Sequence, residues 1–376
     1  MFSGLDEKLM ARAIELARRG EFTTTPNPIV GCVIADNDKI LGEGAHLKAG
    51  EPHAEVHALA MAGDRARGAT AYVTLEPCSH YGRTPPCAKA LIEAGIARVV
   101  IAQGDINPEV SGGGIRMLQQ AGIQVEQGLL ELEARVLNPG FNKRMFCGLP
   151  YVTVKMAATL DGRTALSNGE SQWITSPEAR SDVQLHRARS CAILSTAQTV
   201  IRDDASLNVR PEQSKILAQG YPDLPLRQPQ RIIIDSQNRI TPEQSLLQKP
   251  GEVWLARRNT QGGFGSQVQE LALPVTDSGK ICLSSLMRYL GEQQINSVWV
   301  EAGAGLAGAL LEQQLVDELV VYLAPKLMGD QARGMAQLPD YTSMSQLPEL
   351  EFTSIEQIGP DIKLTAKPTK ICLPES

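Results

Sequence analysis

Three residues whose side chains zinc prefers as ligands, His53, Cys78 and Cys87, lie in one short stretch of the chain. One imidazole and two thiolates give zinc three ligands and leave its fourth tetrahedral position open for water. Zinc lowers the pKa of such a water to about 7. Glu55 follows His53 by two residues, so its carboxylate can take a proton from the water and pass it to a leaving amine. The spacing therefore predicts a catalytic zinc centre with one zinc ion per chain.

The order of these residues follows the H-x-E and P-C pattern of zinc-dependent deaminases. One feature departs from that pattern, because eight residues rather than two separate Cys78 from Cys87. Gly82 and the pair Pro85 and Pro86 can turn this segment so that Cys87 still reaches the metal. The alternative interpretation is two unrelated cysteines and a core histidine, and the ordered occurrence of all four residue types weighs against it.

The other histidines have two interpretations each. His57 follows His53 by four residues, but Glu55 is misplaced for an H-E-x-x-H motif, so we expect His57 to be a packed residue behind the zinc ligands or in the core. His46 and His80 lie in polar segments, where each contacts substrate or is an ordinary surface residue.

A second motif that could take part in ligand binding is the glycine pattern from Gly303 to Gly308. It follows a strand-like run at residues 297–301. Glycines at the start of a helix let backbone N–H groups approach a phosphate. An ordinary Rossmann domain is not indicated, because the motif lies on a late strand and no suitable acidic residue follows about 20 residues on. The alternative is a turn of small residues packed under the helix at residues 306–314.

Alternating strand-like and helix-like segments must position these residues. In the first 145 residues we expect helices at 5–19, 53–62, 86–94 and 114–121, and strands at 29–35, 71–75, 98–102 and 123–126. This alternation predicts a mainly parallel sheet with helices on its faces. A helix-like stretch at 129–146, interrupted at Asn138 to Gly140, ends the unit.

A second unit begins near Tyr151, with strands expected at 151–156, 192–195, 231–235, 253–256, 297–301 and 318–324, and a long exposed loop at 211–230. We therefore predict two α/β domains, at residues 1–147 and 148–376.

Composition narrows the class of protein. The 376 residues are 43% hydrophobic with a net charge of -6, which excludes a disordered chain and disfavours a general nucleic-acid binder. Seven scattered cysteines do not indicate a disulfide framework. The N-terminus lacks a signal-peptide pattern and no apolar run approaches the roughly 20 residues of a membrane span. We expect a soluble, cytoplasmic protein with reduced thiols and no membrane partner.

Several segments together resemble the family of bifunctional riboflavin-biosynthesis deaminase–reductases, the RibD/RibG type. They are TPNPIVGCVI (25–34), HAEVHAL (53–59), TLEPCSHYGRTPPC (74–87), GDINPEVSGGGIRMLQQAGI (104–123), VKMAATLDGRTAL (154–166), SQWITSPEAR (171–180) and TVIRDDASLNVR (199–210). The eight-residue gap between the cysteines is the form that this family uses.

The resemblance implies a cytidine-deaminase-like three-layer αβα domain followed by a dihydrofolate-reductase-like α/β domain. It implies hydrolytic, zinc-dependent deamination of 2,5-diamino-6-(5-phosphoribosylamino)pyrimidin-4(3H)-one to 5-amino-6-(5-phosphoribosylamino)uracil. Reduction of the ribosyl to the ribityl side chain with NADPH would follow. The implied partners are small pyrimidine nucleotides rather than nucleic acid, and the implied assembly is a homo-dimer or homo-tetramer joined through the reductase half.

The resemblance also assigns residues. Those that would line NADPH are Ala157, Trp173, Thr199, Asp203, Ser236, Gly303, Ala304, Gly305, Leu306, Ala307, Gly308 and Ala309. Those that would line the reductase substrate are Ser171, Arg187, Leu207, Arg210 and Glu301. Asn27, His46 and His80 match positions that face the pyrimidine.

Side-chain chemistry adds to these assignments. The guanidinium groups of Arg187 and Arg210 suit a substrate phosphate. Lys155 either faces the ribose or is a lysine at the end of a buried strand.

Two other functions are weighed against this one. A nucleic-acid base deaminase uses the same zinc site, but the acidic composition and the reductase-like second half argue against it. A structural zinc site normally has four protein ligands, and His80 is the spare candidate for a fourth.

Overall fold

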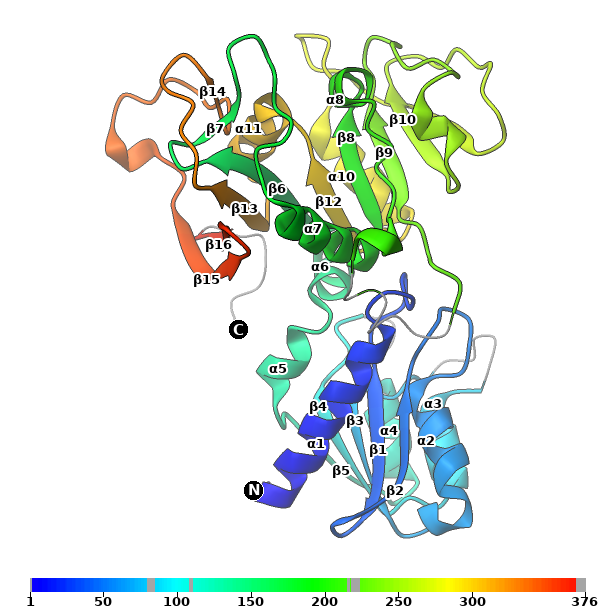
Figure 1. Cartoon of the computed structure of the whole chain (residues 1–376). Helices are drawn as coiled ribbons and strands as arrows, with labels where there is room; N and C mark the ends of the chain where they lie inside the picture. Colours follow the sequence, from blue (N-terminus) through cyan, green and yellow to red (C-terminus); the bar gives the residue numbers. More distant parts are fainter. Residues whose placement is uncertain (1, 80–84, 108–110, 215–216, 218–223, 370–376) are drawn as a thin grey trace. The chain divides into compact units, whose positions relative to one another are not determined.

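The structure is a computed structural model of the chain, and it describes all residues except 1, 80–84, 108–110, 215–216, 218–223 and 370–376 (Figure 1). The chain divides into two compact units. The first unit comprises Met1–Phe146 and Gly220–Pro225, and the second comprises Cys147–Gln219 and Leu226–Ser376.

The first unit is built on a five-stranded sheet with the order β2-β1-β3-β4-β5. The strands are β1 (Gly31–Asp36), β2 (Lys39–Ala45), β3 (Thr70–Leu75), β4 (Arg98–Gln103) and β5 (Gln124–Gln127). β1 pairs antiparallel with both β2 and β3, whereas β3, β4 and β5 run parallel. Since β2 and β3 both run opposite to β1, four of the five strands point the same way, so the expected mainly parallel sheet is confirmed with β1 as its one reversed strand. Asn37, with a φ of 51°, turns β1 back into the hairpin strand β2, which was not predicted.

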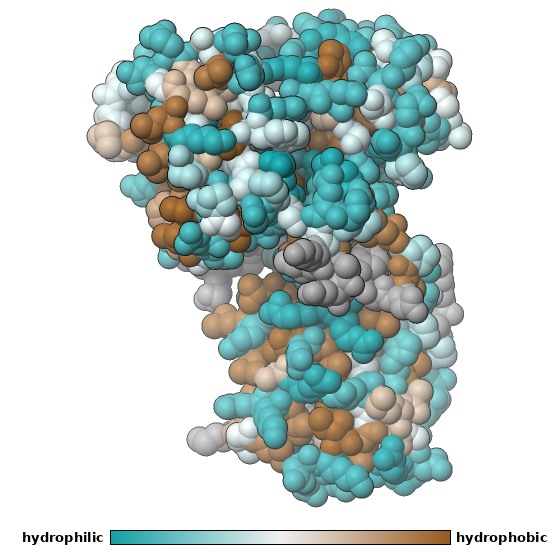
Figure 2. All heavy atoms as spheres, viewed as in Figure 1, coloured by the Kyte–Doolittle hydropathy of each residue, from teal (hydrophilic) through white to brown (hydrophobic). Residues whose placement is uncertain are grey.

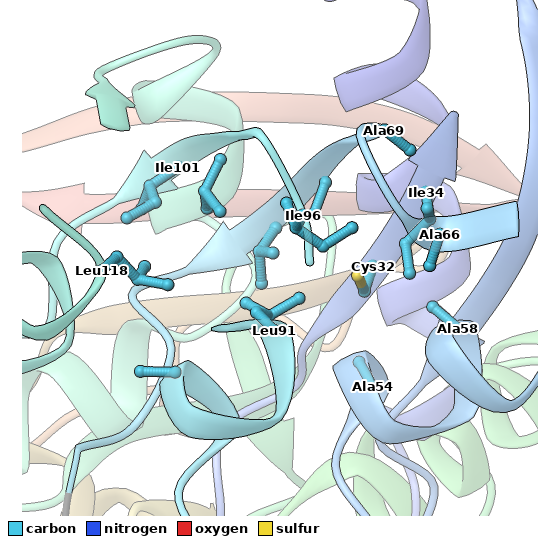
Figure 3. Close-up of a cluster of buried hydrophobic side chains, with 14 of the residues drawn as sticks. Cys32, Ile34, Ala54, Ala58, Ala66, Ala69, Leu91, Ile96, Ile101 and Leu118 are labelled. Carbon is cyan, nitrogen blue, oxygen red and sulfur yellow. The ribbon is translucent and has the colours of Figure 1, made fainter. Parts of the chain in front are cut away.

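Helices cover both faces of this sheet. They are α1 (Gly4–Ala17), α2 (Ala54–Ala62), α3 (Cys87–Glu93), α4 (Gly113–Gln120), α5 (Glu131–Arg135) and α6 (Pro139–Cys147). Because side chains alternate along β1, Cys32 and Ile34 pack with α2, α3 and α4 on one face, as Figure 3 shows. Val33 and Ala35 pack against α1 on the other face. This gives the three αβα layers that the resemblance implied.

Glycines in β2 bring α2 close to the sheet. A Cβ at Gly42 would lie 2.1 Å from the Ala58 carbonyl oxygen, and one at Gly44 would lie 2.0 Å from the Ala54 carbonyl oxygen. The helix backbone therefore rests directly on the strand. This contact fixes the start of α2, where His53 and Glu55 lie.

The second unit contains a nine-stranded sheet with the order β11-β10-β9-β8-β12-β6-β13-β16-β15. The strands are β6 (Tyr151–Thr159), β8 (Ala192–Thr196), β9 (Gln230–Ile234), β10 (Val253–Arg257), β11 (Val268–Ala272), β12 (Ser297–Glu301), β13 (Glu318–Ala324), β15 (Leu350–Ile358) and β16 (Asp361–Pro368). The strands from β11 to β13 run parallel, and β16 and β15 add two antiparallel pairings. Two short strands, β7 (Arg163–Ala165) and β14 (Arg333–Gly334), pair separately.

The helices of the second unit are α7 (Pro177–Arg189), α8 (Ala197–Asp203), α10 (Leu283–Glu292) and α11 (Ala304–Glu312). α10 and α11 share one hydrophobic cluster with the sheet, and α7 and α8 share another. All six predicted strands of this unit are present, but β7, β11, β14, β15 and β16 were not predicted. The loop expected at 211–230 lies partly outside the described residues. Within the described part of the chain, no helix is both long and apolar enough to cross a membrane.

Candidate active sites

The first unit brings His53, Cys78 and Cys87 together. Their ligand atoms lie within 4.8 Å of one another, and the described residues contain no other such group of three His, Cys, Asp or Glu side chains. The Nδ1 atom of His53 is 3.3 Å from the Sγ atom of Cys87 and 3.7 Å from that of Cys78. His53 is the N-cap residue of α2, and Cys87 is the first residue of α3. The described cysteines 32, 147, 191 and 282 are not in this group, and Cys372 lies outside the described residues.

The donor set fits zinc. The Cys78 Sγ atom accepts a hydrogen bond of 3.3 Å from the Cys87 backbone N–H. Hydrogen bonding from the Cys87 thiol lowers the pKa of Cys78 to about 4, and the same interaction, together with burial, raises the pKa of Cys87. One thiolate is thus already favoured, and the second needs a cation beside it. A zinc ion bound by both sulfurs supplies that charge.

Glu55 has the environment expected of a proton carrier. Its side chain is 3% exposed, and its Oε2 atom has no hydrogen-bond partner among the described residues. Burial is the main cause that raises the pKa of Glu55. An unpartnered carboxylate oxygen beside the zinc donors fits a group that handles the protons of a bound water.

Glu76 holds the cysteine-bearing loop, a role that the sequence analysis missed. Its two carboxylate oxygens accept hydrogen bonds from four backbone N–H groups at and before the start of α4, those of Asp105, Gly112, Gly114 and Ile115. Gly114 must lack a Cβ, because that atom would lie 1.9 Å from the Pro77 carbonyl oxygen. The three consecutive glycines at the start of α4, residues 112–114, were the available signal, and the sequence analysis used them only as part of a resemblance.

The exposure of the histidine side chains tests the interpretations made from the sequence. His46 lies in the loop that follows β2, as expected, but it is 2% exposed and so is not an ordinary surface residue. Its ring meets that of His53 at a centroid distance of 5.1 Å. His57 is exposed, so the prediction of a packed residue is also wrong. The reason is that His53 has extended backbone angles before α2 and does not share a helical face with His57. His80 lies outside the described residues.

Asn27 and His46 form a pair. The Nδ2 atom of Asn27 lies 3.1 Å from the Nε2 atom of His46, and the Nδ1 atom of His46 lies 3.1 Å from the Pro52 carbonyl oxygen. Because a carbonyl oxygen can only accept, Nδ1 carries the proton and Nε2 accepts from Asn27. Burial lowers the pKa of His46, which agrees with a neutral ring. The Asn27 amide is thereby oriented.

The second unit contains a cavity of about 810 Å³ at the carboxyl ends of β6, β8 and β12. Ligands of parallel α/β sheets bind at this edge. The predicted substrate residues Ser171, Arg187, Leu207, Arg210, Glu301 and Lys155 all line it. The predicted cofactor residues that line it are Ala157, Trp173, Thr199, Asp203, Gly303, Ala304, Gly305 and Leu306.

Four predicted cofactor residues lie elsewhere. α11 starts at Ala304, so residues one turn later face the protein: Ala307 is buried in the core, Ala309 packs against it, and Gly308 lies against the backbone of Gln337. Ser236 lines a separate hollow of about 130 Å³. Thr196 and Gln198 border both spaces, so this hollow lies beside the main cavity.

The two arginines predicted for a phosphate differ in their partners. Arg187 is buried, and its Nε and Nη2 atoms donate to the two carboxylate oxygens of Glu301 at 2.6 and 2.8 Å. Its Nη1 atom donates to the Asn208 carbonyl oxygen at 2.8 Å. Arg210 has a buried Nε atom without a hydrogen-bond partner among the described residues, and burial lowers its pKa. Arg210 is therefore the better placed of the two for a phosphate.

The cavity also fits a dinucleotide. Gly303 is the N-cap residue of α11, and within the described residues no atom lies within 4 Å of the position that a Cβ would take there. Backbone N–H groups at a helix start in such an open position suit a pyrophosphate. Arg180, Arg202 and Arg333 add positive charge to the lining.

Comparisons with known proteins cover both units. Residues 3–103 match the family model of the cytidine and deoxycytidylate deaminase zinc-binding region, and residues 150–364 match that of the RibD C-terminal domain. The riboflavin biosynthesis protein RibD of Escherichia coli K12 is 56% identical over 363 residues, which cover 96% of this chain and 98% of that protein. The corresponding protein of Haemophilus influenzae is 53% identical over 370 residues, 98% of either chain.

Solved structures agree. Acinetobacter baumannii RibD (form 1) has a TM-score of 0.89 at 44% identity, covering 97% of this chain and 99% of that one. A Thermotoga maritima protein described as a diaminohydroxyphosphoribosylaminopyrimidine deaminase and 5-amino-6-(5-phosphoribosylamino)uracil reductase has a TM-score of 0.85 at 32% identity, with the same coverage. The chain belongs to the RibD family of riboflavin-biosynthesis proteins, and it is a bifunctional enzyme, a zinc-dependent deaminase and an NADPH-dependent reductase.

Proposed function

We propose that the domain at residues 1–147 deaminates 2,5-diamino-6-(5-phosphoribosylamino)pyrimidin-4(3H)-one. The domain at residues 148–376 then reduces the ribosyl chain of the product, 5-amino-6-(5-phosphoribosylamino)uracil, to a ribityl chain. One observation supports this above all: a single chain holds a zinc donor set beside a buried carboxylate, one oxygen of which has no partner among the described residues, and also a cation-lined cavity of about 810 Å³. The description of the Thermotoga relative names the same two activities.

In the deaminase, His53, Cys78 and Cys87 hold the zinc, which supplies a water of lowered pKa when it is bound. Glu55 takes a proton from that water at its free Oε2 atom and returns it to the leaving amine. The reaction consumes one water, exchanges the C–NH₂ group for C=O, and releases ammonia. Burial of Glu55 keeps bulk water from competing for this proton.

Asn27 and His46 contact the pyrimidine, and His80 is assigned to the same site by the resemblance. Because the Asn27 NH₂ group donates to His46, its Oδ1 atom is left to accept a hydrogen bond from the ring. The pair thus presents a hydrogen-bond acceptor of defined orientation to the substrate.

In the reductase, the start of α11 at Gly303, Ala304 and Gly305 binds the pyrophosphate of NADPH, which supplies the hydride. Ala157, Trp173, Thr199, Asp203 and Leu306 complete its surroundings. Arg210, whose Nε atom has no hydrogen-bond partner among the described residues, binds the substrate phosphate, and Ser171 and Leu207 line the same pocket.

Lys155 and Glu301 face the ribosyl group. They occupy opposite positions on the neighbouring strands β6 and β12. Burial lowers the pKa of Lys155, so its Nζ atom releases a proton more readily than an exposed lysine. The pKa of Glu301 is lowered to about 2, because Arg187 outweighs the effect of burial. The ionised Glu301 therefore accepts a hydrogen bond from a ribosyl hydroxyl. Lys155 delivers the proton that accompanies the hydride.

The experiment is to supply the diamino-pyrimidinone nucleotide to the purified chain and to measure zinc, ammonia and NADPH oxidation together. We expect one zinc per chain, and one ammonia and one NADPH per substrate, in that order. Deamination of RNA or DNA in place of the nucleotide would favour the base-deaminase alternative. A zinc-edge spectrum with four protein ligands would refute the catalytic zinc site.

We further propose a homo-dimer or homo-tetramer joined through the second unit. β15 is one of the two edge strands of its sheet, and Phe352, Ile355 and Ile362 on β15 and β16 are exposed. Figure 2 shows hydrophobic residues over this edge. Sedimentation analysis measures the state directly. The need for reduced zinc-ligating thiols and for NADPH supports a cytoplasmic location.

A further inference from the structure

The carboxylate of Glu301 has a third donor besides the two nitrogens of Arg187. Trp299 precedes Glu301 by two residues on β12, so both side chains lie on the same face of the sheet. Trp299 is 1% exposed, and its indole N–H donates to the Oε1 atom of Glu301 at 2.9 Å. No motif in the sequence indicated this contact.

The three hydrogen bonds distinguish the two oxygens of Glu301. Oε1 accepts from the Arg187 Nε atom at 2.6 Å and from the Trp299 Nε1 atom at 2.9 Å. Among the described residues, Oε2 accepts only from the Arg187 Nη2 atom, at 2.8 Å. Because each carboxylate oxygen has about two acceptor sites, Oε1 is filled and Oε2 keeps one site for a ligand in the cavity.

The indole ring is itself held in place. The ring of His186 stacks on it with a centroid distance of 4.6 Å and an interplanar angle of 8°. His186 lies 3.6 Å from the Asp182 carboxylate, which also accepts hydrogen bonds from the Tyr322 hydroxyl and the Lys363 ammonium group. These contacts come from α7, β13 and β16, so the packed core of the unit fixes the direction of the indole N–H.

We propose that Trp299 is a positioning residue for the reduction. Its N–H fills the last acceptor site of the Glu301 Oε1 atom, so that Oε2 is the oxygen that accepts a hydrogen bond from the ribosyl hydroxyl. Without this donor, Oε1 has a free acceptor site, and the carboxylate can bind the hydroxyl in a second, unproductive arrangement. This inference rests on the proposed function, in which Glu301 contacts the ribosyl group.

The test compares two tryptophan variants. Trp299→Phe removes the N–H and keeps an aromatic ring on His186. Trp254→Phe is the matched control, because Trp254 is also buried and its indole nitrogen has no hydrogen-bond partner in the described part of the chain. We expect Trp299→Phe to lower the kcat for reduction about ten-fold relative to the control, the effect of one lost hydrogen bond to a charged group. The KM for NADPH and the release of ammonia are expected to stay unchanged.

Glu301→Gln separates the two ways in which this can fail. If that variant reduces the uracil nucleotide at the wild-type rate, the proposed role of Glu301 is wrong, and the inference falls with it. If Glu301→Gln is slow but Trp299→Phe has the kcat of Trp254→Phe, only the inference about Trp299 is overturned. Should Trp299→Phe fail to fold, benzothienylalanine at position 299, whose sulfur replaces the N–H at nearly equal volume, must show the same loss of kcat.

Discussion

Replacing Gly308 by alanine should destabilise the second unit. Gly305 belongs to the same glycine pattern, but a substitution there should not have this effect. The new Cβ would lie 1.9 Å from the Gln337 carbonyl oxygen, whereas real Cβ contacts are essentially never under 3.0 Å. α11 must therefore move by more than 1 Å from the backbone at Gln337, which also strains the hydrogen bond from the Gln337 N–H to the Ala304 carbonyl oxygen at 3.0 Å.

The loss in the free energy of unfolding is the sum of two unfavourable effects and one favourable effect. Overpacking costs about 1–3 kcal/mol and a weakened hydrogen bond about 1 kcal/mol, while alanine gains about 1 kcal/mol over glycine in a helix. The net loss of about 1–3 kcal/mol corresponds to a decrease in Tm of about 2–12 °C for a unit of this size.

Gly305→Val should have the opposite profile. A Cβ at Gly305 meets one atom within 4 Å among the described residues, the Oε1 atom of Gln337 at 3.2 Å, which is the movable end of a side chain. The unit should keep its Tm. The valine blocks the approach of a pyrophosphate to the α11 N–H groups, and losing one charged hydrogen bond should raise the Kd for NADPH about 10- to 100-fold.

The assay is a thermal melt, an NADPH titration and an ammonia-release measurement on the same two preparations. Both variants should deaminate normally, because the zinc donors all lie in the first unit. Unchanged NADPH affinity in Gly305→Val would refute the assignment of this loop to the cofactor. An unchanged Tm in Gly308→Ala would refute the packing argument, and lost deamination in a folded variant would refute the independence of the two units.

Three further changes test the first unit. Glu55→Gln should keep its zinc and its reductase activity on supplied deaminated substrate but lose about 10²–10⁴-fold in ammonia release, and near-normal release would show that Glu55 carries no proton. Cys87→Ser should lower the zinc content measured by elemental analysis, whereas Cys282→Ser, outside the ligand group, should not; equal losses would contradict the ligand assignment. The pKa of Asp6 is lowered chiefly because Arg98 donates to it at 2.6 Å, so this stabilisation is present above about pH 4 and is lost as the pH falls further. In the wild type, the protection of the α1 amides in hydrogen exchange should therefore decrease below about pH 4, and in Asp6→Asn it should decrease less. An identical decrease in both proteins would refute this role of Asp6.

The zinc donors could be predicted because each is defined by a local pattern. His53 and Glu55 are two residues apart at a helix start, and Cys87 begins the next helix. Local spacing of this kind does not depend on the complete topology, since neither the reversed direction of β1 nor the unpredicted hairpin strand β2 moves these residues away from the helix starts. The position of His57 shows the limit, because one residue with extended backbone angles removes the helical register on which its prediction depended.

The strand β2 was missed for a physical reason. Its sequence, KILGEGA, contains Gly42 and Gly44, and glycine is depleted in strands because it has no side chain to pack. Here the packing partner is the backbone of α2, which approaches so closely that a Cβ cannot be accommodated at either position. The two glycines that let the helix bearing Glu55 pack onto the sheet are thus also the reason why residue propensities do not predict this strand.

Arg187 and Arg210 show what spacing along the chain cannot decide. Both are arginines near the same cavity, and in the sequence both suit a phosphate equally well. Their difference comes from Glu301, which is 114 residues from Arg187 and occupies two sides of its guanidinium. The ion pair satisfies a buried acid, so Arg187 is committed to shaping the site. Of these two arginines, Arg210 has no carboxylate partner among the described residues and remains for the ligand. Roles in this cavity therefore follow from which charges are already paired, and that information exists only once β12 and α7 are packed together.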